Sequence, residues 1–171
     1  MKLSVRLVAL VGAAALTVGL TVGSAASGKT TTSQSRLARA CTGHQLKVRL
    51  GGLDAAAGSA YQTIRFTNTS GRRCVLKGFP HVSFRGKHGH RIGYPAARTG
   101  HPRRVALRPG WTAKASLQIP NWHNFPRRDC DAKGSPRLRV VPPGTHRKVG
   151  FHYPAKTCTT KKGRSYIRPV H

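Results

Sequence analysis

The sequence predicts an all-β protein, an antiparallel immunoglobulin-like β-sandwich with two disulfides. Three observations support this prediction. Short segments of alternating apolar and polar residues recur along the chain, Gly- and Pro-rich turns separate them, and four cysteines are spread over the same region. No segment shows the periodicity of an amphipathic helix. A closed β-barrel is the alternative architecture.

The first expected strand covers residues 45–50, where apolar and polar side chains alternate. Gly51 and Gly52 are expected to end it. Residues 55–60 are rich in alanine and could form at most one turn of helix. The second expected strand covers residues 61–68, with Ile64 and Phe66 on one face, and residues 68–71 form a turn.

The remaining expected strands are short, rich in β-branched and aromatic residues, and separated by turns at 78–80, 109–110 and 142–144. They cover residues 74–76, 82–84, 105–107, 113–119, 138–140, 149–151 and 166–170.

Residues 1–26 have the order of a secretory signal peptide, with Lys2 and Arg6 before an uncharged apolar run and small residues up to Ala26. A membrane-spanning helix is disfavoured because the run is shorter than the roughly 20 residues that cross a bilayer. Residues 27–40 are expected to be a flexible Ser/Thr-rich spacer, and residues 41–171 a single domain. We therefore expect a secreted, extracellular or cell-wall-associated monomer without a transmembrane segment in the mature chain.

Four cysteines in an exported chain predict two disulfides. Three pairings are possible, and we favour Cys41–Cys74 with Cys130–Cys158 because each pair brackets one contiguous half of the domain. A zinc site is disfavoured because no Cys-x-x-Cys occurs. A polar stretch separates Cys41 from the apolar run, so we expect a domain cysteine and not a lipid anchor.

Several motifs of the domain occur in the order known from one family. They are Cys41, Ala-Ala-Ala-Gly at 55–58, Asn-Thr-Ser-Gly at 68–71, Cys74, Leu-Lys-Gly-Phe-Pro at 76–80, Leu-Arg-Pro-Gly at 107–110, Cys130, Val-Pro-Pro-Gly at 141–144, Cys158 and Pro-Val at 169–170. This order resembles the family catalogued as domain of unknown function 4232, over nearly all of residues 41–171. The resemblance implies an actinobacterial secreted protein or lipoprotein, a β-sandwich and two disulfides, and it implies no activity.

The chain is poor in groups that perform catalysis. Its only acids are Asp54, Asp129 and Asp131, and the last two flank Cys130 among basic residues, where we expect local charge pairing. The four thiols are expected to be oxidised, and neither a Gly-x-Ser-x-Gly motif nor a phosphate-binding Gly-rich loop with a Lys occurs. We therefore expect a non-enzymatic protein with no cofactor and no catalytic residue.

Nine histidines leave one alternative open, a metal-binding protein or hydrolase that uses loop histidines. His88 and His90 have a His-x-His spacing, and His81 lies nearby in the sequence. Lys87 and Arg91 would repel a cation, so we expect no metal site.

Positive charge is the strongest signal. Without Lys2 and Arg6, 29 basic residues face three acids, so the mature chain carries +26. Such a charge favours binding to anionic cell-wall polymers, lipid headgroups or nucleic acid, whereas the alternatives are a solvated cationic surface with no ligand and a domain that docks a protein. Trp111, Trp122 and Tyr166 could stack on bases. The densest basic clusters, and therefore the expected polyanion-binding residues, are Arg103, Arg104, Arg127, Arg128, Lys161, Lys162 and Arg164.

Overall fold

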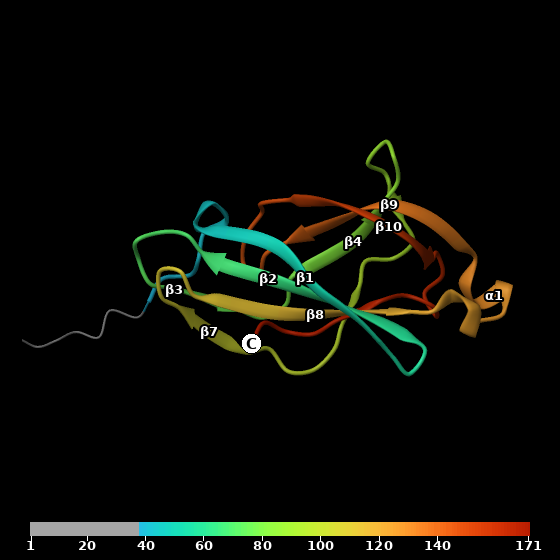
Figure 1. Ribbon diagram of the computed structural model, residues 1–171, viewed down its shortest axis with the longest axis horizontal. Coiled ribbons are helices and arrows are strands. Elements are labelled where there is room, and N and C mark those ends of the chain that lie inside the picture. Colours follow the sequence, from blue (N-terminus) through green and yellow to red (C-terminus); the bar gives the residue numbers. More distant parts are fainter. Residues whose placement is uncertain (1–37) are drawn as a thin grey trace, which may run out of the picture. The chain divides into compact units, whose positions relative to one another are not determined.

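The computed structural model describes residues 38–171, which form a β-sandwich with an accompanying two-stranded ribbon (Figure 1). The predicted fold class is confirmed. The expected signal peptide and most of the expected spacer lie outside the described residues. None of the helices in this part of the chain is long and apolar enough to cross a membrane.

The strands are mostly longer than the sequence patterns indicate. They are β1 (Leu46–Ala56), β2 (Ser59–Asn68), β3 (Cys74–Lys77), β4 (His81–Arg85), β5 (Arg91–Ile92), β6 (Ala97–Arg98), β7 (Arg104–Leu107), β8 (Thr112–Pro120), β9 (Ala132–Val141), β10 (Val149–Cys158) and β11 (Tyr166–Ile167). Three short helices accompany them: the 3₁₀ helices η1 (Gly43–Gln45) and η2 (Trp122–Asn124), and α1 (Arg127–Cys130).

One sheet has the strand order β1-β2-β8-β11-β6. Its neighbours pair antiparallel except β11 and β6, which run parallel. The sequence prediction that Gly51 and Gly52 end the first strand is wrong, because β1 continues past them with a register shift between Leu50 and Leu53. Pairing with β2 on both sides of the glycines holds the strand together, and the bulge absorbs the irregularity.

Residues 55–60 form no helical turn but the tip of the β1–β2 hairpin. Ala57 and Gly58 both have positive φ, at 46° and 68°. Two successive residues with positive φ match the right-handed twist of the flanking strands, so this local geometry closes a tight hairpin. The alanines therefore join two strands.

The second sheet has the order β10-β9-β4-β5, with all neighbours antiparallel. Its inner face meets the five-stranded sheet in one apolar core, to which Phe66 and Leu117 contribute from one sheet and Phe84 and Leu138 from the other. The ribbon β3-β7 adds Leu76 and Leu107 to the same core. A sandwich of separate sheets replaces the alternative of a closed barrel.

The predicted disulfide pairing is confirmed by bonds Cys41–Cys74 and Cys130–Cys158. The first holds the chain ahead of β1 against β3, and the second joins α1 to the end of β10. The predicted turn at residues 68–71 is also present. Its Asn68 side chain is fully buried and donates hydrogen bonds to the carbonyls of Arg72 and Leu107, at 2.8 and 3.1 Å.

Candidate functional site

Cross-strand pairing places a row of basic side chains across the four-stranded sheet. Arg85 on β4 lies opposite Arg91 on β5 and also opposite Arg137 on β9. Arg137 in turn lies opposite His152 on β10. Because neighbouring strands are about 4.8 Å apart, the row spans about 14 Å across four strands. Arg139, two residues along β9 from Arg137, begins a second row.

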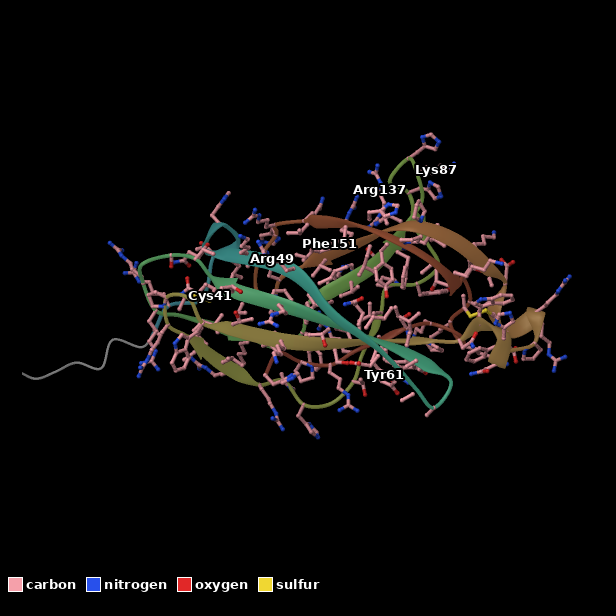
Figure 2. The ribbon with its side chains drawn as sticks, in the orientation of Figure 1. Cys41, Arg49, Tyr61, Lys87, Arg137 and Phe151 are labelled. Atoms are coloured by element: carbon pink, nitrogen blue, oxygen red, sulfur yellow. A yellow bond between two sulfur atoms is a disulfide. The ribbon has the colours of Figure 1, made fainter. Side chains whose placement is uncertain are left out.

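The alternation of strand side chains places this row on the outer face of the sheet. Along β4 and β9, Phe84 and Leu138 are buried in the core, so Arg85 and Arg137 point away from it. Figure 2 shows Arg137 on the outer side of this sheet and Phe151 on the core side. We call this surface the arginine face, and define it by Arg85, Arg91, Arg137, Arg139 and His152.

Arg85 is held in place by its surroundings. Its Nε donates to Ser83 Oγ at 3.2 Å, and its Nη1 donates to the Gly89 carbonyl at 3.3 Å. Its backbone N–H donates to Ser135 Oγ at 3.2 Å. Ser83 and Ser135 are both buried. Their hydroxyl groups therefore hold Arg85, at the centre of the arginine face, in a fixed position.

The charges of this surface repel one another. Burial and the neighbouring Arg139 and Arg91 lower the pKa of Arg85. Burial, followed by the charges of Arg85, Arg98 and Arg91, lowers the pKa of His81 on the same sheet. Like charges placed directly opposite each other destabilise a sheet. Repulsion among the arginines therefore lowers the stability of this sheet, and a bound anion would reduce that repulsion.

None of the three acids of the chain belongs to the arginine face. Asp54 lies on β1 in the other sheet, Asp129 lies on α1, and Asp131 precedes β9. Arg137 is six residues from Asp131 along an extended strand, a separation of about 20 Å. The field at the arginine face is therefore set by cations.

Two of the sequence-predicted basic clusters come together around α1. Arg127 and Arg128 lie on α1, and the Cys130–Cys158 disulfide brings the loop containing Lys161, Lys162 and Arg164 next to it. We call this region, residues 127–133 with residues 159–164, the α1 end; Figure 1 labels α1.

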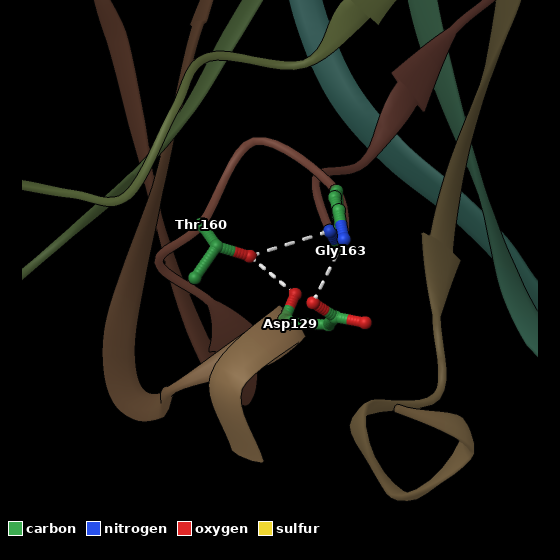
Figure 3. A network of polar contacts seen from close by, with 4 residues as sticks. Asp129, Thr160 and Gly163 are labelled. Carbon is green, nitrogen blue, oxygen red and sulfur yellow. Dashed lines mark hydrogen bonds and ion pairs between the residues drawn. The ribbon is translucent and has the colours of Figure 1, made fainter. Parts of the chain in front are cut away.

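The α1 end also holds two of the three acids, and their predicted local charge pairing is confirmed. Lys162 Nζ contacts Asp129 Oδ1 at 3.0 Å, and Lys133 Nζ contacts Asp131 Oδ2 at 3.5 Å. Figure 3 shows Asp129 together with Thr160, whose Oγ1 donates to the Asp129 carbonyl. A hydrogen bond from Thr159, followed by the charge of Lys133, lowers the pKa of Asp131. The polar contacts here stabilise a loop.

The third predicted cluster lies apart, on the β3–β7 ribbon. Arg104 begins β7 and pairs with Lys77 of β3. Arg103 lines a hollow of about 520 Å³ together with His101 and Arg168. This surface is cationic as well, but only Arg104 and Lys77 lie opposite each other in register, and the hollow beside them is lined by loop residues.

The histidines do not converge. Across residues 38–171, no three His, Cys, Asp or Glu side chains lie close enough together to hold a metal ion. His81 is on β4 beside arginines, whereas His88 and His90 are on the β4–β5 loop. The metal-dependent alternative therefore has no geometric support in this part of the chain.

The three aromatic candidates for stacking lie in different settings. Trp111 is 54% exposed, and the guanidinium of Arg108 lies 5.0 Å from its ring centroid. Trp122 lines a cleft beside Lys156, and Tyr166 is half-buried on β11. None of these rings lies on the arginine face.

The arginine face was not among the sequence-predicted sites, because its residues are separated in the sequence. The usable signal was alternation: Arg137 and Arg139 alternate with Leu138 and Val140 on an expected strand, which puts both guanidiniums on one face. Which strands lie beside β9 could not be read from the sequence.

The comparison with protein families agrees with the motif order. The model of the family described as Domain of unknown function (DUF4232) matches residues 41–171. No curated protein matches the chain. The match begins at Cys41, covers both disulfides, and includes every residue of the arginine face and of the α1 end. The chain belongs to the DUF4232 family.

Proposed function

We propose that this protein is an exported, non-enzymatic binding module for anionic polymers, and that the arginine face is its main contact surface. The observation that best supports this proposal is that three arginines lie opposite one another on neighbouring strands with no acid beside them: Arg91, Arg85 and Arg137. Phosphate groups are the natural counterparts, because guanidinium groups match them with paired hydrogen bonds.

The proposed ligand is a phosphate-rich wall polymer, with released nucleic acid or lipid headgroups as further anions that the same surface would bind. Recognition by a row of cations is electrostatic and reads charge spacing rather than sequence. The net charge of the mature chain, +26, adds long-range attraction to anionic polymers. Export is supported by the expected signal peptide and by the two disulfides.

The test compares binding of the oxidised mature domain to a phosphate-rich wall polymer, duplex DNA and a neutral glycan over a salt series. We expect binding to both phosphate polymers that weakens steeply with salt, and none to the glycan. The double variant Arg137→Gln/Arg139→Gln should lower the slope of log K against log salt by about 0.9 per lost phosphate contact on duplex DNA.

The matched control is Arg127→Gln/Arg128→Gln, which removes the same number of charges at the α1 end. We expect it to change the slope less than the arginine-face variant does. Equal losses in the two variants would mean that total charge, and not the arginine face, determines binding. Salt-independent binding would exclude the polyanion mechanism altogether.

A further inference from the structure

An apolar cleft opens between the β1–β2 hairpin and β10. One wall is formed by residues 55–60 of the hairpin, and the opposite wall by Tyr153, Pro154 and Ala155. Ile119 also lines it, and Trp122 lines one side. The volume is about 770 Å³, within the roughly 300–1,000 Å³ typical of small-molecule sites.

The cleft follows from irregularities on both of its sides. The register of β1 shifts between Leu50 and Leu53, and that of β10 shifts between His152 and Ala155. Such bulges bend strands and increase their twist. The small side chains of the alanine-rich hairpin then leave the space unfilled.

The Trp122 side is fixed to the hairpin. Asn124 Nδ2 donates to the Gly58 carbonyl at 3.0 Å, and the Asn121 backbone N–H donates to the same carbonyl at 2.9 Å. The Asn121 side chain also accepts from the His123 N–H at 3.1 Å. These bonds hold η2, and with it the Trp122 ring, against the hairpin turn.

The lining combines a large apolar surface with one positive charge. Lys156 is its only charged residue, and its Nζ lies 4.6 Å from the centroid of the Trp122 ring. Asp54, the nearest acid in the sequence, does not line the cleft. Leu53 lines it while remaining 58% exposed, and burial raises the pKa of Tyr153. The cleft is therefore lined mainly by apolar side chains, with one positively charged side chain, Lys156, among them.

We propose that this cleft binds a single-chain amphipathic anion of the fatty-acid class, with the alkyl chain between the hairpin and β10 and the carboxylate at Lys156. Its apolar lining suits an alkyl chain, and its only charged residue selects a negative head group. This site is separate from the arginine face and takes a different class of ligand, so it does not depend on the proposed function.

The test uses Trp122 as a reporter. The chain has two tryptophans, and Trp111→Phe in the oxidised mature domain leaves Trp122 as the only one. Octanoate, decanoate and dodecanoate are titrated below their aggregation concentrations, with decanol and decyltrimethylammonium as neutral and cationic counterparts. Salt is held at about 0.5 M, where the Debye length is only about 4 Å and general attraction to the cationic surface is screened.

We expect saturable binding of one anion per chain, with affinity rising about two- to fourfold for each added methylene. Decanoate should bind more tightly than decanol, and decyltrimethylammonium most weakly. Lys156→Gln should weaken decanoate about three- to fivefold and leave decanol unchanged. Lys47→Gln, an exposed lysine of β1 outside the cleft, should change neither.

Three outcomes would overturn the proposal: no saturable binding by fluorescence and calorimetry, an affinity independent of chain length, or equal binding of the cationic amphiphile. An equal loss in Lys156→Gln and Lys47→Gln would assign the binding to general surface charge instead. None of these outcomes bears on polymer binding at the arginine face, which is measured with different ligands and different variants.

Discussion

The α1 end and the arginine face are both rich in basic residues, yet their electrostatic settings are opposite. At the α1 end, Asp129 and Asp131 pair with Lys162 and Lys133, and a disulfide fixes the loop. On the arginine face, Arg85 lies between Arg91 and Arg137 with no acid beside it. The α1 end, whose basic residues are more densely clustered in the sequence, is thus the region where acids neutralise more of the positive charge.

This difference shows that local charge density in a sequence is a poor guide to an anion site in a β-protein. Strand pairing concentrates isolated arginines, because each strand contributes one outward side chain to the same row. We therefore expect the α1 end to contribute mainly to stability and the arginine face mainly to binding.

The largest expected effect tests the structural role of the α1 end. Replacing Cys130 and Cys158 together by Ser should lower the free energy of unfolding by about 3–4 kcal/mol. Without the cross-link, the unfolded chain regains the conformational entropy that closing a loop of this length removes. Urea unfolding followed by tryptophan fluorescence measures the loss. While the variant remains folded, its salt slope for duplex DNA should match that of the parent domain.

A charge inserted into the arginine face should have the next largest effect. Gly150 on β10 lies opposite Arg139, and a Cβ added there meets no atom within 4 Å. Gly150→Glu should therefore pair with Arg139 and lower the affinity for duplex DNA about tenfold at low salt, with a shallower salt slope. Gly150→Gln has the same shape without the charge, and should lose much less. Equal losses in the two variants would point to steric blocking.

The sandwich and the disulfide pairing could be predicted because alternation and cysteine order are local properties of the sequence. The course of β1 through Gly51 and Gly52 could not, because it depends on pairing with β2 along its whole length. The arginine face could not be predicted either, because it also depends on how the strands pair. Its residues become neighbours only when β4, β9 and β10 are placed side by side, and no local pattern specifies that order.

A smaller effect separates stability from binding on the arginine face. Arg137→Gln removes the positive charge opposite Arg85, and should raise the free energy of unfolding by about 0.2–1 kcal/mol at low salt. High salt should abolish the gain, since it screens the repulsion. The same variant should bind phosphate polymers more weakly. Opposite changes in stability and affinity are expected of a surface whose repulsion a ligand relieves. A loss of both would indicate a structural role for Arg137.

The smallest expected effect is a titration shift at His81. Its pKa lies below the ordinary value of 6.5 because of burial and the neighbouring Arg85, Arg98 and Arg91. The native state therefore binds this proton less readily than the unfolded state, so stability is retained above pH 6.5 and declines as the pH falls below it. His81→Gln should flatten that decline in urea unfolding measured between about pH 5 and 7.

A bound phosphate polymer should raise the pKa of His81, because its negative charge offsets the arginines. By linkage, the polymer should then bind more tightly as His81 becomes protonated. An NMR titration of the His81 ring with and without a short phosphate oligomer measures the shift directly, in the parent domain and in the variants Arg137→Gln/Arg139→Gln and Arg127→Gln/Arg128→Gln. An equal loss of the shift in both variants would show that the polymer coats the whole cationic surface, whereas a loss confined to Arg137→Gln/Arg139→Gln would locate the polymer on the arginine face.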